Sequence, residues 1–383
     1  MLAQSSWSKP ADVIIVGGGV IGLSIARELA LRGVRNVTVV DRAEFGMEAS
    51  RAAGGILGPQ AEANRLDDFF KLTSASRDLY PNFAAALYEQ TGIDVELDRT
   101  GTLFLGLTEE DECTLRRRHE WQKEAGLRVE WLSADDARQL EESISPAVRG
   151  ALIFPDDWQV ENRKLIQALL VSNKKLGVEL IANCEVRSIR IAHRRVTGIE
   201  CSNKVLATGV VVMAAGAWST NIHAATSTAP QIEPVRGQML CFKAKPLFAR
   251  HLLYSPRGYL VPRRDGRLLA GSTSDHVGFD RRVTKEGIEA IKSMAFEIAP
   301  VLESLAIVDS WAGFRPRAPD DLPLLGSDGE VDGLFYATGH YRNGILLAPI
   351  TAKLLADTIV DGSTSERLEA FSPSRFRLAA AGE

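Results

Sequence analysis

Three glycines near the N-terminus have the spacing of a phosphate-binding turn. Gly17, Gly19 and Gly22 follow the β-branched run 12–16 and open a segment of helical period. In this context the first glycine permits a tight turn, the second lets the backbone approach a pyrophosphate, and the third lets the helix pack against the strand. Asp41 ends the next predicted strand, where a carboxylate can accept hydrogen bonds from ribose hydroxyls. The pattern predicts a dinucleotide site, and a glycine-rich turn beside a surface aspartate is the alternative.

A second glycine-bearing corner lies near the C-terminus. The run GHYRNGILLAP, residues 339–349, directly follows a predicted strand at 334–338. Because Pro349 has no N–H and would break a helix interior, we expect the helix to begin near Leu346 and to keep Pro349 in its first turn. Unpaired amides at this helix start could hold negative charge, such as the anionic edge of a reduced flavin. An ordinary strand-to-helix corner is the alternative.

The elements around these motifs predict a mixed α/β fold. Strands at 12–16 and 37–41 enclose a helix that ends at Gly33, and together they form a Rossmann-like βαβ unit. The segment 93–107 alternates apolar and polar residues around an Arg-Thr-Gly turn and predicts an antiparallel hairpin, with which a different sheet begins. Other segments predict further strands at 178–191, 210–215, 239–244, 259–264, 267–272 and 334–338, and helices at 160–176 and 346–360.

Two types of sheet interleave along the chain, which predicts two domains built from non-contiguous segments. We assign 1–90, 150–221 and 322–383 to a Rossmann-like cofactor-binding domain. The segments 91–149 and 222–321 form, in this prediction, a substrate-binding domain on a mixed, largely antiparallel sheet.

The composition argues against several classes of protein. Of the 383 residues 45% are apolar and 25% charged, as in ordinary globular proteins, and the net charge of -4 lacks the basic excess that nucleic-acid binding needs. Four scattered cysteines without a C-x-x-C pair argue against a disulfide framework and a metal site, and they favour a cytoplasmic location.

The longest nearly uncharged stretch, 13–26, would span only about 21 Å as a helix, so we expect no transmembrane segment. The first ten residues carry no basic cluster ahead of an apolar core, and we expect no export signal.

Seven segments together resemble the flavin-dependent amine oxidoreductases of the D-amino acid oxidase superfamily, and most closely the glycine oxidase (ThiO-like) group. They are spread over essentially the whole chain, at 13–30, 49–58 (ASRAAGGILG), 211–219 (VVMAAGAWS), 234–240 (PVRGQML), 258–273, 311–316 (WAGFRP) and 339–349. The resemblance implies FAD, a discontinuous FAD-binding domain and a substrate domain whose mixed sheet covers the flavin face. Some relatives attach the flavin to a cysteine shortly before the last motif, but 315–339 contains none, so we predict noncovalent FAD.

The resemblance also assigns cofactor contacts position by position. These are Gly17, Gly19, Gly22, Asp41 and Arg42; Val186, whose backbone would contact adenine; Gly216 and Trp218 at the following turn; Ala53, Gly54 and Gly55 along the flavin; and Gly339, Arg342, Asn343, Gly344 and Ile345. The first five would hold the ADP half of FAD. The last five would surround the isoalloxazine.

The same resemblance implies that Arg315 and Tyr259 bind the substrate carboxylate, with Arg342 as a second cation at the catalytic site. A guanidinium matches a carboxylate in two-pronged geometry, and each charge-assisted hydrogen bond contributes on the order of 1.5–3 kcal/mol. The alternative is that Arg315 pairs with Asp320 or Asp321 while Tyr259 only packs in its strand.

The function implied is oxidative deamination of glycine, sarcosine or a small D-amino acid by hydride transfer to FAD. The products would be an imine or 2-oxo acid, ammonia and hydrogen peroxide, with oxygen as the second substrate and a role in forming the thiazole of thiamine. We also expect Glu62 to line the entrance and the protein to form a homotetramer. Two alternatives stay open: a D-amino acid or D-proline dehydrogenase with a non-oxygen acceptor, and an electron-carrying flavoprotein subunit.

Overall fold

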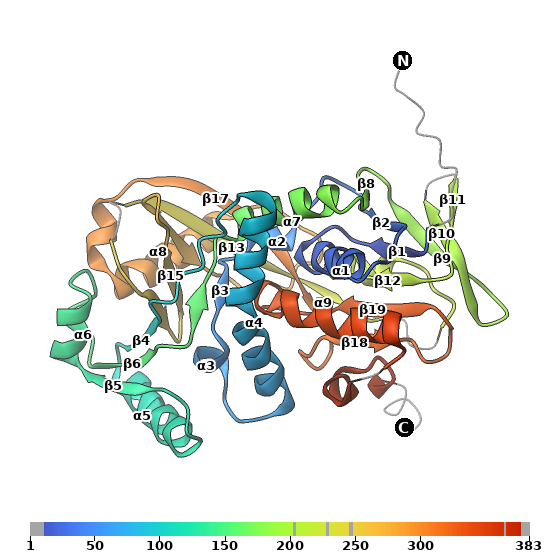
Figure 1. Ribbon diagram of the computed structural model, residues 1–383. Coiled ribbons are helices and arrows are strands. Elements are labelled where there is room, and N and C mark those ends of the chain that lie inside the picture. The colour runs from blue at the N-terminus through green and yellow to red at the C-terminus, as the bar shows by residue number, and fades with distance from the viewer. Residues whose placement is uncertain (1–10, 202–203, 227–229, 245–247, 364, 377–383) are drawn as a thin grey trace.

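The molecule is built around two large β-sheets that lie side by side. The computed structural model describes residues 11–201, 204–226, 230–244, 248–363 and 365–376, and Figure 1 shows the six-stranded sheet on the right and the eight-stranded sheet on the left. This architecture confirms the predicted mixed α/β fold.

The predicted βαβ unit forms the centre of the six-stranded sheet. Its parts are β1 (Val13–Val16), α1 (Val20–Leu31) and β2 (Val37–Val40). The strand order is β18-β19-β12-β1-β2-β8, parallel except between β18 and β19. The other strands are β8 (Glu179–Ile181), β12 (Val211–Met213), β18 (Leu324–Ser327) and β19 (Leu334–Thr338).

Both faces of this sheet are covered, which explains why β1 has no polar residue. Alternate side chains of a strand point to opposite faces. Ile15 packs into a core with α1, with α7 (Asn162–Lys175) and with α9 (Gly344–Asp361). Ile14 packs instead against a three-stranded sheet of β9 (Val186–Ala192), β10 (Arg195–Cys201) and β11 (Lys204–Ala207).

The second sheet has the order β17-β13-β16-β15-β14-β4-β6-β5 and is antiparallel except between β14 and β4. Its strands are β4 (Thr102–Gly106), β5 (Glu130–Ser133), β6 (Gly150–Phe154), β13 (Glu233–Lys243), β14 (Leu252–Ser255), β15 (Gly258–Pro262), β16 (Arg267–Gly271) and β17 (Ile307–Arg317). Helix α8 (Lys285–Ile298) covers the face that carries Leu240 and Leu260. The opposite face carries Met239 and Tyr259.

The predicted hairpin at 93–107 is wrong. Only β4 within it is a strand, and β4 pairs with β6 on one side and with β14 on the other. Alternation of apolar residues shows which side chains face a core, but strand partners far along the chain leave no local signal. The proposed two-domain division stays a prediction; β6, which follows the boundary expected at residue 150, pairs within the eight-stranded sheet.

The long helix α4 (Asp68–Thr91) lies against α9 and explains a second error. Helix α9 begins at Gly344 instead of near Leu346, so Pro349 lies inside the helix. A proline there leaves the carbonyl of Ile345 without its usual N–H partner. The Tyr80 hydroxyl of α4 donates to this oxygen, and Ser76 Oγ donates to the carbonyl of Leu346 at 2.6 Å. Helix α4 therefore makes the early start of α9 possible.

Short elements complete the fold. They are α2 (Ala49–Ala52), β3 (Ile56–Leu57), α3 (Pro59–Glu62), α5 (Glu109–Glu124), α6 (Ala134–Leu140), β7 (Trp158–Gln159) and the 3-10 turns η1 (Gly216–Asn221), η2 (Pro300–Ser304) and η3 (Glu366–Phe371). Among the described residues, none of the helices is both long enough and apolar enough to cross a lipid bilayer.

Candidate active site

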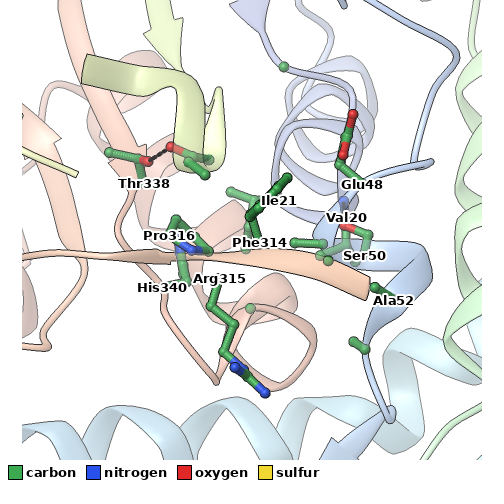
Figure 2. A pocket seen from close by; sticks show the side chains of 18 of the residues that line it. Val20, Ile21, Glu48, Ser50, Ala52, Phe314, Arg315, Pro316, Thr338 and His340 are labelled. Carbon is green, nitrogen blue, oxygen red and sulfur yellow. Dashed lines mark hydrogen bonds between the residues drawn. The ribbon is translucent and has the colours of Figure 1, made fainter. Parts of the chain in front are cut away.

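A cavity of about 340 Å³ lies where the carboxyl ends of β1, β2, β12 and β19 meet the Met239 face of the second sheet. Figure 2 shows part of its lining, including Ser50, Phe314 and Arg315. Open α/β sheets bind ligands at this edge. Of the residues singled out from the sequence, all line the cavity except Gly22 and Gly339.

The glycine turn at the first end of the cavity needs its glycines for geometric reasons. Gly17 has φ +110°, and a Cβ there would lie 2.3 Å from the carbonyl oxygen of Ala214. A Cβ at Gly22 would lie 1.9 Å from the carbonyl oxygen of Gly17, so Gly22 serves the contact of α1 with the turn. A Cβ at Gly19 would meet only Ser50 Oγ, at 3.1 Å. Gly17 and Gly19 thus present backbone to the cavity.

Asp41 lies beside this turn with both carboxylate oxygens engaged. Oδ2 accepts the N–H of Gly18 at 2.7 Å, and Oδ1 accepts the N–H of Ala43 at 2.9 Å. Burial raises the pKa of Asp41, and the two hydrogen bonds oppose that rise. Next to it the Arg42 guanidinium lies 3.8 Å from the ring centroid of Trp218.

Ser50 is a cavity residue that the sequence analysis did not single out. Its Oγ accepts the N–H of Val20 in the first turn of α1 at 2.9 Å. Its own neighbourhood carries no signal for this contact, because α1 and Ser50 meet only in the fold. Other lining residues that were not singled out flank motif residues: Met239, Ser272, Phe314, Thr338 and His340.

The N-terminus of α9 lies at the other end of the cavity. Gly344 and Ile345 line the cavity, and the N-cap residue Asn343 makes no side-chain cap hydrogen bond. Gly339 turns the chain with φ +72°, behind the lining. Burial lowers the pKa of His340 to about 3, so its imidazole is neutral, and its Nε2 lies 3.1 Å from Thr351 Oγ1.

Arg315 makes neither of the ion pairs considered from the sequence. Its Nη1 donates to the carbonyl of Thr273 at 3.0 Å and its Nη2 to Ser272 Oγ at 2.5 Å. The two nearby aspartates pair elsewhere: Asp321 with Arg317 at 2.6 Å, and Asp320 with Arg375 at 2.7 Å. The structural alternative for Arg315 is therefore wrong.

A pair of facing glycines makes room around Arg315. Gly237 of β13 lies opposite Gly313 of β17. A Cβ at Gly237 would lie 2.4 Å from Nη2 of Arg315, and a Cβ at Gly313 would lie 2.4 Å from Cβ of Ala52. The guanidinium consequently lies flat across β13, while α2 approaches β17 closely.

Tyr259 both packs in its strand and lines the cavity. Its side chain is 9% exposed, and its hydroxyl lies 3.3 Å from Ser272 Oγ, the same hydroxyl that Arg315 contacts. A Cβ at Gly54 would come within 3.3 Å of its ring. Tyr259 and Arg315 thus share a hydrogen-bond partner on the wall of one cavity.

Arg342, in contrast, already has a carboxylate partner. Its Nη2 lies 3.4 Å from Glu62 Oε1 and donates to the Tyr254 hydroxyl at 3.0 Å. The Tyr254 hydroxyl in turn donates to Glu62 at 3.2 Å. The carboxylate of Glu62 raises the pKa of the Arg342 guanidinium, which stays protonated. Glu62 lines the cavity.

A buried carboxyl group holds the segment that carries Glu62. Asp157 is 0% exposed, and its two oxygens accept the N–H groups of Gln60 at 3.0 Å and Ala61 at 2.7 Å. Burial raises the pKa of Asp157 to about 7. The position of Glu62 at the cavity therefore depends on a group outside it.

The cavity has the donors that a flavin dinucleotide requires. Backbone of glycines faces it near the start of α1, where within the described chain only the N–H of Val20 has a side-chain partner, Ser50, and a pyrophosphate fits the positive helix end. The uncapped start of α9 lies at the other end, where an anionic ring edge fits for the same reason. Among the described residues no cluster of three His, Cys, Asp or Glu could hold a metal ion.

Comparisons with known proteins agree with this geometry. The family "FAD dependent oxidoreductase" (DAO) matches residues 12–358. A glycine oxidase of Geobacillus kaustophilus is 37% identical over 366 residues, which cover 95% of this chain and 97% of that protein. A solved structure of glycine oxidase from the same organism has a TM-score of 0.91 at 37% identity, covering 95% and 98% of the two chains. A bifunctional ThiO/ThiG protein of Synechocystis is 37% identical over 96% of this chain, which spans only 54% of that longer protein.

Proposed function

The chain belongs to the FAD-dependent oxidoreductase family, and we propose that it oxidatively deaminates glycine or another small amine acid. It is an FAD-dependent amine oxidase. Oxygen would be consumed to give the imine and hydrogen peroxide, and water would hydrolyse the imine to the 2-oxo acid and ammonia. Similarity to ThiO/ThiG supports a role in thiamine thiazole synthesis.

The observation that carries the proposal is the Arg315 guanidinium on the cavity wall, next to Tyr259 and without a carboxylate partner among the described residues. A substrate carboxylate would complete its hydrogen bonds in two-pronged geometry. Arg342 is less suited as the main anchor, because Glu62 already balances its charge.

The chain's own groups would bind and orient the substrate and would not remove a proton with a strong base. His340 is neutral but engaged with Thr351, and the Tyr259 hydroxyl lies in a largely buried wall. With the carboxylate held at Arg315, the substrate Cα would be fixed in a pocket that excludes most water. Bound FAD would supply the acceptor for the α-hydrogen and its electron pair.

The proposal is tested by mixing the holoenzyme without oxygen with glycine, sarcosine, D-alanine and D-proline and following flavin absorbance. We expect glycine or another member of this panel to bleach the flavin, and hydrogen peroxide to form when air is admitted. Bleaching without peroxide would contradict the oxidase and favour a dehydrogenase. Absence of bleaching across the panel would overturn the substrate class.

The mode of flavin attachment and the assembly are part of the same proposal. Noncovalent FAD predicts that acid precipitation releases the yellow colour into the supernatant, and colour in the pellet would contradict it. Sedimentation velocity tests the proposed homotetramer, and cell fractionation tests the proposed cytoplasmic location.

A further inference from the structure

One exposed aromatic side chain outside the cavity braces its wall. Phe279 belongs to residues 275–284, the segment between β16 and α8, which we call the strap. Its side chain is 42% exposed, yet its ring stacks on Trp218 with 5.3 Å between centroids and an interplanar angle of 25°. Trp218 lines the cofactor cavity and Phe279 does not. The strap therefore reaches the wall from the outside.

The contact forms part of a cluster of rings and charges. Phe279 also meets Phe314 edge to face at 5.5 Å, and Phe314 lies 6.0 Å from Trp218. On its inner side Trp218 carries the Arg42 guanidinium at 3.8 Å. Rings in these arrangements, and a cation over a tryptophan face, attract one another beyond their apolar contact.

A second strap residue, Arg281, reaches the same wall. Arg281 forms an ion pair with Glu48, and Glu48 also pairs with Arg42 at 2.8 Å. The Arg281 guanidinium lies 5.7 Å from the centroid of the Phe314 ring. Figure 2 shows Glu48 on the same side of the view as Val20 and Ser50, near the start of α1. The wall next to the nucleotide end is thus held by two strap side chains.

The backbone of the strap is fixed to the eight-stranded sheet before and after Phe279. Arg236 of β13 is 5% exposed; its Nε pairs with Asp275 at 3.0 Å, and its Nη1 donates to the carbonyls of Asp280 at 3.1 Å and Arg282 at 3.0 Å. Gln238 Oε1 accepts the N–H of Thr284 at 2.7 Å. These anchors hold the strap backbone on both sides of Phe279, and Phe279 itself stays 42% exposed.

We propose that the strap retains FAD: Phe279 and Arg281 hold the wall formed by Arg42, Glu48, Trp218 and Phe314 closed beside the nucleotide half of the cofactor. FAD leaves or enters when this contact opens. The inference rests on FAD binding, which family membership establishes, and is independent of the substrate proposed above.

The strap is tested by the rate at which FAD leaves the holoenzyme, measured from the rise of flavin fluorescence after dilution. Phe279→Ala removes two ring contacts and is expected to speed release roughly 10- to 100-fold. Val277→Ala is the matched control, because Val277 lies in the same strap and is also 42% exposed, but has no aromatic ring to stack on Trp218. We expect its release rate to stay within about twofold of the wild-type rate.

Two further variants separate the contact from general destabilisation. Phe279→Trp keeps an aromatic face and should restore slow release. Arg281→Gln removes the ion pair with Glu48 and should speed release most at low salt, where ion pairs are least screened. Unchanged release in folded Phe279→Ala protein, or equal acceleration in Val277→Ala, would overturn the proposal. No substrate is present, so a wrong amine substrate would not affect the outcome.

Discussion

The two ends of the cavity are built from different parts of the chain. At the nucleotide end the cavity meets backbone, with Gly17 and Gly19 exposing their main chain beside the start of α1. At the substrate end it meets long side chains from separate segments, above all Glu62, Tyr259 and Arg315. The glycine turn of the first end follows from local chain geometry, whereas the second end depends on side chains that only the tertiary fold brings together.

The two ends of the cavity should therefore lose their function in different ways. A backbone-built site fails when a side chain is added, because nothing nearby can move aside. A side-chain-built site fails when a side chain is removed or its support is lost, and then it fails by degrees.

The largest effect is expected for Gly17→Ala at the nucleotide end. The new Cβ would lie 2.3 Å from the Ala214 carbonyl oxygen, and φ +110° is strained for alanine. We expect FAD affinity to fall by at least roughly 100-fold, since relief of this overlap moves the turn. The FAD that each variant retains is measured after gel filtration, as the ratio of the absorbance of the flavin band to that of the protein band.

Gly33→Ala is the control for Gly17→Ala. Gly33 also has a positive φ, +87°, but a Cβ there would have no neighbour within 4 Å. Gly33→Ala should therefore lower the free energy of unfolding by only about 1 kcal/mol and leave the flavin bound. Equal loss of flavin in both variants would show that strain alone, and not the close approach, controls the site.

The next largest effect is expected on the pH dependence of stability, through Asp157, which holds the segment that carries Glu62. The folded-state pKa of about 7 lies above the ordinary value of 3.8, so the fold favours the protonated carboxyl. Its contribution to the free energy of unfolding is full below pH 4 and is lost as the pH rises through 7, by on the order of a few kcal/mol. Asp157→Asn removes this titration.

Urea unfolding at saturating FAD between pH 4 and pH 8 measures the effect. The stability of the wild-type protein minus that of Asp157→Asn should fall as the pH rises. A difference that is constant or rises with pH would mean that Asp157 is ionised throughout, held so by the amides of Gln60 and Ala61.

Arg315→Leu comes third and tests the substrate end directly. Loss of charge-assisted hydrogen bonds worth about 1.5–3 kcal/mol should raise KM roughly 10- to 150-fold, with FAD content unchanged. Arg315→Lys keeps the charge without the planar fork, so its KM should lie between those of the wild-type enzyme and Arg315→Leu. A wild-type KM in Arg315→Leu would contradict the carboxylate assignment.

The smallest effect is expected for Tyr254→Phe. The Tyr254 hydroxyl links Arg342 and Glu62 but does not line the cavity. Removing it should change KM roughly two- to tenfold, the range for one or two ordinary hydrogen bonds. A change as large as that of Arg315→Leu would mean that the Arg342 cluster is the main anchor.

The same contrast explains what the sequence could predict. The βαβ unit and its turn follow from local patterns, because glycines, strand and helix are neighbours in the chain. The places of Tyr259 and Arg315 beside the cavity were predicted only through a family resemblance. Nothing local shows that Ser50 caps Val20 or that β4 pairs with β6. The early start of α9 depends on hydroxyl groups of α4.

Those two hydroxyl groups have a consequence for biosynthesis. Tyr80 and Ser76 lie 265 and 270 residues before the carbonyls that they serve. A chain emerging from the ribosome completes α4 long before α9 exists, so the ring-side cradle forms only when nearly all of the polypeptide has been made. With the isoalloxazine placed at α9 as proposed, its capture would be an event of the nearly finished protein.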